Sequence, residues 1–460
     1  MKKLYSIFLC LLLLCVPAQF VSSQNIADGL TAGMETLFSN GIVLLYNIAY
    51  SNLLVYYNSA ENANWTTPNA DAIYRNFNEP WIWEDTDGFK VNQIGHPIQG
   101  SIYFNSGRVN GFGFYESVFF NLLGSFTWES LCESNYASIN DFIFTVAGSA
   151  PMGEMLFRLY LEACAAGVPA PLAAIFNPMA GFHRLVTGWK PPNNGRNLYR
   201  LQYWLGMGFA QTRYSLSSDE DFFSFNGLFG NLGFNAVYGN PFEQESKTPF
   251  EQFELAMSFG LDASRYIDIR MISDGYLFSF SPVSTDSDMM STGLSLHMDF
   301  VSLGKFDMYD STVDQSDNAL NWTIKYQHLF SENTTFQMKL HAGFIFIGAS
   351  EYYSPQMERE LKNYGGGLNG KLFLAFENKK FGKLETSLFC YAMWSFPGTS
   401  AISQGSVFWL FADVTYSRFI SKHVSLGIWD SFALERGTFS NFPNTRKYNN
   451  AVNLFVAWNF

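Results

Sequence analysis

The sequence closes on VNLFVAWNF (residues 452–460), and this stretch decides the fold. In an extended strand successive side chains point to opposite faces, so the stretch divides into two sets. Leu454, Val456, Trp458 and Phe460 form one face, and Asn453, Ala457 and Asn459 form the other. Bacterial outer-membrane barrels typically end on such a strand with an aromatic residue. We therefore expect a β-barrel in the bacterial outer membrane, with the strand ending at Phe460 read by the barrel assembly machinery.

The same alternation continues upstream, from about residue 197 onward. Phe336, Met338, Leu340, Ala342, Phe344 and Phe346 interleave with Gln337, Lys339, His341 and Gly343. Alternating apolar and polar positions in segments separated by turns are typical of a transmembrane barrel. The pattern predicts twelve antiparallel strands, starting near residues 197, 224, 249, 265, 290, 317, 334, 363, 381, 406, 422 and 446. The first half is less regular, so ten or fourteen strands stay open.

Composition supports a barrel and excludes other classes. Aromatic residues make up 18% of the chain, with 47 Phe and 24 Tyr, which fits the aromatic girdles of a barrel. The mature sequence has no run of 18 apolar residues, which disfavours spanning helices. The formal net charge of −12 argues against nucleic acid as a partner. Outer-membrane lipid is the partner that this composition predicts.

The first residues predict a secretory signal peptide. Lys2 and Lys3 precede the apolar run 4–16, and small residues stand at Ser22 and Ser23. We expect residues 1–23 to be removed. Residues 24–196 then form a mainly α-helical plug or periplasmic domain, and residues 197–460 form the barrel. Helices are expected near 26–57, 111–132, 140–165 and 171–187, with loop-like sequence at 58–95 and a Pro191-Pro192 linker.

The helical half carries a dense set of polar motifs. It contains HPxxGxxYxNxxRxNG at 96–111, followed by Trp128-Glu129, SxND at 138–141 and Gly153-Glu154. In these motifs the chain resembles an uncharacterised Bacteroidota outer-membrane family known only as a domain of unknown function. The resemblance spans about residues 90–190. It implies an envelope protein with a C-terminal barrel and brings no established activity.

Two carboxylates in this region are candidates for chemistry. Glu129 and Glu133 are four residues apart and would share one face of a helix. They could hold a divalent ion or perform acid–base catalysis, with His96 and Asp141 completing the site. Alternatively, they pair with Arg108, Arg158 or Arg184 and lock the helices together, the ordinary role of acids in an apolar bundle. The sequence identifies neither a metal nor another cofactor.

The remaining polar residues have simpler interpretations. Ser138 and Asp141 fit a cap at the start of a helix. Glu154 and Arg158 have the i,i+4 spacing of a salt bridge. Together with Arg108, Glu116 and Arg184, they are expected to form a structural polar network. His96 by itself is most simply a neutral imidazole that donates to a backbone carbonyl.

Three functions remain open. The first is a gated transport or export barrel for an envelope or nutrient molecule, with the helical region as plug or adaptor. The second is an enzyme that modifies envelope lipid or lipopolysaccharide with the acidic cluster. The third is a structural barrel. The chain lacks the Gly-x-Ser-x-Gly, phosphate-loop and His-Glu-x-x-His motifs, so the sequence does not decide whether it is an enzyme.

Overall fold

The computed structural model describes residues 23–56, 68–83, 87–192, 196–216, 221–242, 245–262, 266–305, 313–354, 359–399 and 404–460. The signal peptide predicted for residues 1–23 lies outside this part of the chain, apart from Ser23 at its end. The chain divides into two compact units, Met1–Arg196 and Asn197–Phe460. Each unit is described separately below.

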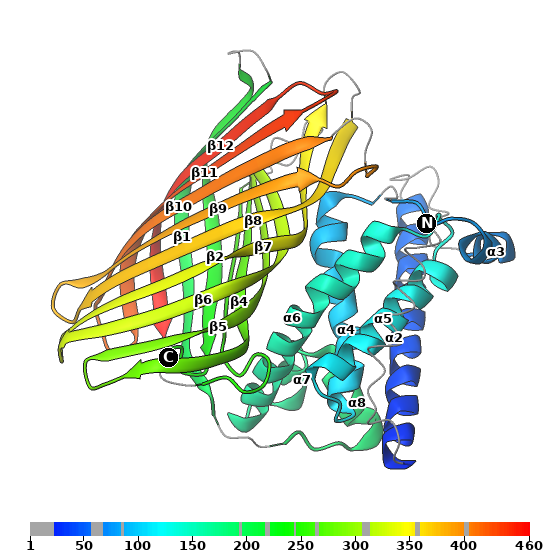
Figure 1. The fold of residues 1–460 in the computed structure, drawn as a ribbon, viewed down its shortest axis with the longest axis horizontal. Helices are drawn as coiled ribbons and strands as arrows, with labels where there is room; N and C mark the ends of the chain where they lie inside the picture. Colours follow the sequence, from blue (N-terminus) through cyan, green and yellow to red (C-terminus); the bar gives the residue numbers. More distant parts are fainter. Residues whose placement is uncertain are drawn as a thin grey trace. The chain divides into compact units, whose positions relative to one another are not determined.

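The second unit is a closed antiparallel β-barrel in which each strand pairs with its neighbours in sequence and β12 returns to β1 (Figure 1). The strands are β1 (Leu198–Leu216), β2 (Asp221–Tyr238), β3 (Phe253–Leu261), β4 (Tyr266–Ser284), β5 (Asp288–Lys305), β6 (Val313–Ser331), β7 (Thr334–Ser354), β8 (Arg359–Asn378), β9 (Gly382–Ser395), β10 (Gly405–Phe419), β11 (Val424–Phe439) and β12 (Thr445–Asn459). The prediction of a transmembrane barrel with twelve strands is confirmed. Each strand begins within about four residues of its predicted start.

The last strand behaves as its alternation predicts. Leu454, Trp458 and Phe460 are exposed on the outside, whereas Asn453 and Ala457 are buried. Phe460 closes the barrel, because its backbone N–H donates to Leu201 O and its carbonyl accepts from Leu201 N. Because the barrel is closed, no strand edge is left with unpaired backbone groups. A hydrocarbon environment requires such pairing.

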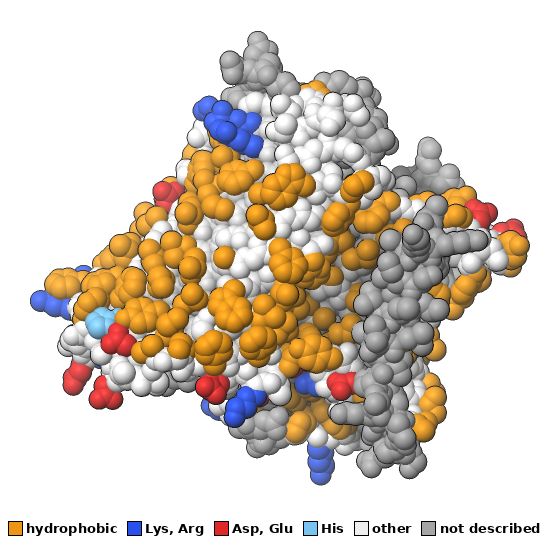
Figure 2. Space-filling view, viewed as in Figure 1, with side chains coloured by type: hydrophobic (Ala, Val, Ile, Leu, Met, Phe, Trp, Pro, Cys, Tyr) orange, Lys and Arg blue, Asp and Glu red, His pale blue; other side chains and the backbone are white. Residues whose placement is uncertain are grey.

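Large apolar side chains cover the outer surface of the barrel (Figure 2). Exposed examples follow one another on single strands, such as Leu205, Met207 and Phe209 on β1. A soluble protein rarely exposes so continuous an apolar surface, whereas lipid requires it.

The connection between β2 and β3 is longer than a tight turn. Residues 239–252 between β2 and β3 fold against β4: Phe250 N donates to Tyr276 O, and Tyr276 N donates to Gln252 O. Phe250 has φ of 61°, a conformation that costs free energy in any residue other than glycine. Its ring is buried and lies over Gly275, where a Cβ atom would come within 2.1 Å of it. The short strand β3 and this packed connection explain the irregular pattern of the first half.

The first unit is helical. It contains α2 (Ser23–Tyr56), α3 (Ala70–Asn78), the π-helical turn η3 (Val91–Gly95), α4 (His96–Val109), α5 (Phe114–Thr127), the π-helical turn η4 (Trp128–Cys132), α6 (Ile139–Ala165), α7 (Ala170–Ala173) and α8 (Pro178–Thr187). The expected mainly helical region is confirmed. In the part of the chain that the structure describes, no helix is both long and apolar enough to cross a membrane.

Two helices contradict the sequence analysis. Residues 58–95 were expected to be loop-like, yet they contain α3 and η3, and α4 was not predicted at all. Most of helix α4 is buried, and its buried positions mix small, polar and large apolar residues, so the helix lacks a single apolar stripe. A Cβ atom at Gly100 would lie 2.6 Å from Thr145 O, and one at Gly153 would lie 2.7 Å from the Phe104 ring. The glycines therefore let α4 and α6 pack at close range.

Candidate functional site

The structure brings the predicted residues of the helical unit together at the start of α4. His96 is the first residue of α4, and Asp141 lies in the first turn of α6. His96 Nε2 is 3.8 Å from Asp141 Oδ1 and 3.6 Å from Asp87 Oδ2. Both His96 and Asp141 are buried. The interpretation of His96 as a neutral imidazole that donates to a carbonyl is therefore wrong, because two carboxylates face its Nε2 atom.

The charge of His96 follows from this environment. Burial alone would lower the pKa of His96, but the negative charges of Asp141, Asp87 and Glu133 outweigh burial and raise it to about 9. At neutral pH the imidazole is therefore protonated. A protonated imidazole cannot accept a proton as a general base, although it stabilises nearby carboxylates.

Glu129 and Glu133 do not share a regular helical face, because the helix changes between them. Glu129 lies in η4, whose widened turn ends at Cys132, and Glu133 already has extended backbone angles. Glu129 Oε2 accepts a hydrogen bond of 2.8 Å from Ser138 N, and Glu133 Oε1 accepts one of 2.5 Å from Trp128 Nε1. Both carboxylates are buried. π-Helical turns often occur at functional sites, and η3 and η4 both adjoin this cluster.

The arginines take another partner. Glu154 is fully buried and pairs with Arg108 at 2.7 Å and with Arg158 at 2.9 Å. Arg184, in the last turn of α8, contacts Cys164 Sγ at 4.0 Å. Arg108 and Arg158 thus form their described ion pairs with Glu154. Pairing of these arginines with Glu129 and Glu133 was the alternative that the sequence had left open. The predicted salt bridge of Glu154 with Arg158 is present.

Two residues of the predicted polar network, Ser138 and Glu116, lie at helix starts. Ser138 is the N-cap of α6, and its Oγ accepts from Asp141 N at 3.3 Å, as the capping motif predicts. Glu116 lies in the first turn of α5, where a carboxylate is favoured by the helix dipole. Both residues thus act locally on backbone structure.

Sequence reasoning missed one buried pair. Glu35 Oε1 lies 2.6 Å from His183 Nδ1, and Asn110 Nδ2 donates to Glu35 Oε2 at 2.7 Å. The pair joins α2, α4 and α8. Two features of the sequence could have indicated this pair. Glu35 is an acid in the largely apolar segment of α2, and His183 directly precedes Arg184.

The chemical capacity of the helical cluster is limited. Among the described residues, no group of three or more His, Cys, Asp and Glu has the arrangement of a metal site. The carboxylates of Glu129 and Glu133 accept protein hydrogen bonds, and His96 is charged. The geometry therefore fits a structural polar network, and acid–base chemistry with these four residues stays a hypothesis.

A second candidate site lies in the barrel lumen. A cavity of about 270 Å³ lies in the half of the barrel where β1 begins and β12 ends. Side chains that point into the lumen line it. Its apolar lining includes Trp204, Phe373, Phe389, Phe411, Trp429 and Phe455, and its polar lining includes Arg200, Gln202, Asn235, Glu254, Arg270, Asp274, Lys339, Glu385 and Asp413. Ligand sites commonly combine an apolar wall with a few polar groups.

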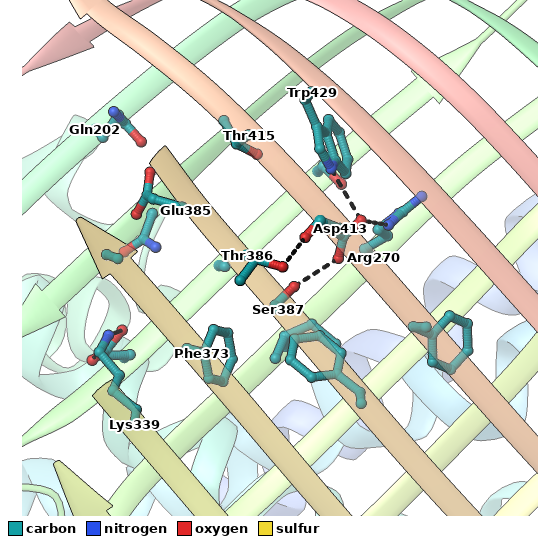
Figure 3. Close-up of a pocket in the computed structure, with 18 of the residues that line it drawn as sticks. Gln202, Arg270, Lys339, Phe373, Glu385, Thr386, Ser387, Asp413, Thr415 and Trp429 are labelled. Atoms are coloured by element: carbon teal, nitrogen blue, oxygen red, sulfur yellow. Dashed lines mark hydrogen bonds and ion pairs between the residues drawn. The ribbon is translucent and has the colours of Figure 1, made fainter. Parts of the chain in front are cut away.

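The acids of this lumen cavity are held by protein partners. Asp413 accepts from Arg270 Nη1 at 3.1 Å, from Ser387 Oγ at 3.0 Å and from Trp429 Nε1 at 3.0 Å (Figure 3). Across the cavity, Glu254 pairs with Lys339 at 2.5 Å. Asp274 pairs with Lys325 at 2.6 Å, and Glu385 pairs with Lys383 at 2.6 Å. The pairs offset the cost of burying these charges.

Beyond the lumen cavity, toward the other end of the strands, buried apolar side chains form a cluster. This loop-side cluster comprises Val301, Leu303, Val313, Ala319, Ile345, Tyr352, Leu361, Phe389, Tyr391, Met393, Val407, Trp409, Phe411, Ala433, Phe439 and Phe442. Trp409 is its largest side chain, is 1% exposed, and donates from Nε1 to Asp314 O at 3.2 Å. The cluster adjoins the cavity, because Val301, Phe389 and Phe411 belong to both.

A serine and a histidine also meet in the lumen. His297 Nε2 lies 2.8 Å from Ser295 Oγ, and His297 Nδ1 lies 2.9 Å from Lys371 Nζ. An ammonium group has only donors, so Nδ1 accepts and a neutral imidazole carries its proton on Nε2. Nε2 then donates to Ser295, and His297 cannot remove the serine proton. The pair is therefore not the activated nucleophile of a lipase.

The helical region matches one family model. Residues 80–177 match the model of a family described as Domain of unknown function (DUF3943), which confirms the resemblance to an uncharacterised domain. The match includes His96, Glu129, Glu133 and Asp141. No curated protein matches the chain.

Several solved structures are similar to the barrel half. An outer membrane channel from Pseudomonas putida F1 is 12% identical, with a TM-score of 0.29, over 59% of this chain and 100% of that chain. The outer membrane protease OmpT from Escherichia coli is 8% identical, with a TM-score of 0.25, over 58% and 99%. The Pseudomonas putida toluene transporter TodX is 8% identical, with a TM-score of 0.23, over 60% and 93%. These three proteins are a channel, a protease and a transporter, and their similarity to this chain is low. The function therefore has to be inferred from the residues of this chain.

Proposed function

We propose that this protein is a gated outer-membrane transporter, in which a small molecule enters the lumen cavity and passes when the loop-side cluster moves. The observation that carries the proposal is the lumen itself. It combines a cavity of about 270 Å³ with an apolar closure that adjoins it. The apolar outer surface supports a position in the bacterial outer membrane, surrounded by its lipid.

The buried charges in the lumen support a transport function rather than a purely structural role. Buried ion pairs stabilise a fold less well than apolar side chains of similar volume. This lumen nevertheless holds Lys325 with Asp274, Lys371 with Asp299, and Lys447 with Glu435, with all three lysines buried. Paired charges can exchange partners during opening, because each keeps a counter-charge within reach.

The helical unit is proposed as a periplasmic adaptor. In this proposal the loop-side cluster closes the lumen with the barrel's own side chains, so the gate does not require a helical plug. The terminal strand, ending on the exposed ring of Phe460, is proposed to be the segment that the assembly machinery binds.

Conductance in planar bilayers tests the gate. The wild type is expected to show rare, small openings. Trp409→Ala removes the largest side chain of the loop-side cluster and should raise the open fraction at least several-fold. Trp322→Ala is the matched control, because Trp322 is 46% exposed on the outer face. Phe442→Ala provides a second opening variant. Folded Trp409→Ala and Phe442→Ala barrels with wild-type conductance would contradict the gate.

A second candidate function is an envelope lipid-modifying enzyme in the helical unit. The specific observation in its favour is the buried cluster of His96, Glu129, Glu133 and Asp141 beside two π-helical turns. Purified protein would be incubated with outer-membrane lipid extract and the lipids followed by mass spectrometry. A product made by the wild type but not by a folded Glu129→Gln/Glu133→Gln variant would establish this function. If this assay and the conductance test both fail, a structural barrel remains.

A further inference from the structure

Three side chains of the lumen cavity each carry one buried polar atom without a hydrogen-bond partner among the described residues. These atoms are Arg200 Nε, Trp204 Nε1 and Asn235 Oδ1. All three residues line the cavity. Leaving a buried donor or acceptor unpaired costs free energy, so such atoms at a cavity wall indicate where a ligand supplies the missing partner.

The strand register places the three side chains next to one another. Arg200 and Trp204 lie on the lumen face of β1, two residues to either side of Gln202. Gln202 pairs directly with Asn235 on β2. Diagonal neighbours on one face of an antiparallel pair are about 7–8 Å apart. Gln202 itself donates to Asn459 Oδ1 at 2.7 Å, so it is already engaged.

Arg200 is a cation of the cavity wall that forms no ion pair among the described residues, whereas Arg270 is shared by Asp268 and Asp413. Glu254, Asp274, Glu385 and Asp413 each pair with a cation other than Arg200. Arg200 stays close enough for its charge to act on Glu254 and Glu385, but it forms no ion pair with them among the described residues. Arg200 and Trp204 then offer a guanidinium and an indole N–H, which are donors that suit a planar anionic group.

The rest of the wall fits an apolar body. Phe373, Phe389, Phe411 and Phe455 line the same cavity. An aromatic or aliphatic group there would replace water along the rings, while the anionic end would lie near β1. Asn235 Oδ1 is an acceptor, so its missing partner is a donor on the ligand, such as a hydroxyl or an N–H, and not the anionic group itself.

From this arrangement we infer that Arg200 and Trp204 form a binding subsite for the anionic group of a small monoanion with an apolar body, and that Asn235 Oδ1 accepts a hydrogen bond from a donor on the same molecule. This inference deepens the proposed function, because it names the class of molecule that would enter the lumen. The anionic group binds to β1, and the apolar part lies along the phenylalanine wall.

The test measures binding in nanodiscs by titration calorimetry, with 2-naphthalenesulfonate as the anionic probe and 2-naphthalenesulfonamide as its neutral counterpart. The wild type should bind the sulfonate at least tenfold more tightly than the sulfonamide. Arg200→Gln should weaken sulfonate binding at least tenfold and leave sulfonamide binding unchanged. Trp204→Phe keeps a ring but removes the N–H, and should weaken sulfonate binding several-fold.

The matched control is Arg446→Gln, because Arg446 is exposed on β12 and lies over the ring of Tyr448. Its sulfonate affinity should equal that of the wild type. Absence of sulfonate binding to the wild type, or equal affinity in folded Arg200→Gln and Trp204→Phe, would overturn the inference. The conductance of Trp409→Ala is independent of this result: binding without conductance would refute transport alone, and conductance without binding would refute the subsite alone.

Discussion

At the scale of single residues, His96 shows how neighbouring charges decide a side chain's role. From the sequence, His96 was grouped with Asp141, 45 residues away, but Asp87, which lies in a segment expected to be loop-like, was not identified. The packing of α4 on α6 brings Asp141 to the imidazole, and the chain just before η3 brings Asp87. With both acids beside it, the imidazole becomes a buried cation.

The pH dependence of the helical unit tests this role. The pKa of His96 is about 9 in the folded protein, against about 6.5 when unfolded. A raised pKa stabilises the fold fully below about pH 6.5, and the contribution is lost as the pH rises through 9. The free energy of unfolding should therefore fall from pH 6.5 to pH 9, by at most about 3 kcal/mol. Urea unfolding, followed by ellipticity at 222 nm, should show this slope and a flatter one in His96→Gln. Equal slopes would refute a charged His96.

Glu129 offers a second test at this scale. Its carboxylate accepts from the buried N–H of Ser138. Glu129→Ala leaves that donor unpaired and should lower the free energy of unfolding by about 1–3 kcal/mol. Glu129→Gln keeps an acceptor and should lose much less. Unfolding midpoints of the two variants decide the point, and equal losses would show that the charge matters rather than the hydrogen bond.

At the scale of elements, the predictability of each segment follows from how many of its faces are buried. Each barrel strand has one face toward lipid and one toward the lumen. The polarity of Leu205 and Gln202 alone therefore indicates the face on which each side chain lies. Helix α4 has no such contrast, because its neighbours surround it. Its small residues, such as Gly100 and Ser101, were therefore interpreted as a motif and not as a helix.

The connection between β2 and β3 is the element whose packing was least predictable. Phe250 adopts a strained backbone and lies over Gly275, a contact that only the folded barrel creates. Gly275→Ala should lower barrel stability by about 1–3 kcal/mol, because a Cβ atom would overlap the ring. Gly230→Ala is the matched control on β2, since a Cβ atom there meets nothing within 4 Å. Thermal midpoints from the electrophoretic shift of folded barrel should separate the two variants. Identical midpoints would contradict the described packing.

At the scale of the whole molecule, location was easier to predict than activity. Twelve strands, their alternation and the terminal aromatic residue are local patterns. The lumen cavity is lined by side chains from every strand except β6. Its unpaired atoms become apparent only when hydrogen-bond partners are assigned across strands. The sequence could show that Arg200 faces the lumen, but not that each acid of the cavity pairs with another cation.

The division of the chain into two units leads to one further prediction. A protease site introduced at residues 190–197 would allow the helical unit to be released after the full protein is reconstituted. Because the loop-side cluster belongs to the barrel, we expect cleavage to leave the closed-state conductance unchanged. A large rise in conductance would show that the helical unit acts as a plug rather than an adaptor.

The most direct measurement is uptake of 2-naphthalenesulfonate into proteoliposomes that contain the full-length protein. The transport proposal predicts saturable uptake above that of protein-free liposomes, and faster uptake with Trp409→Ala. Arg200→Gln should raise the concentration for half-maximal uptake. Uptake equal to that of protein-free liposomes, in both the wild type and folded Trp409→Ala, would contradict the conclusion that this lumen is a gated passage.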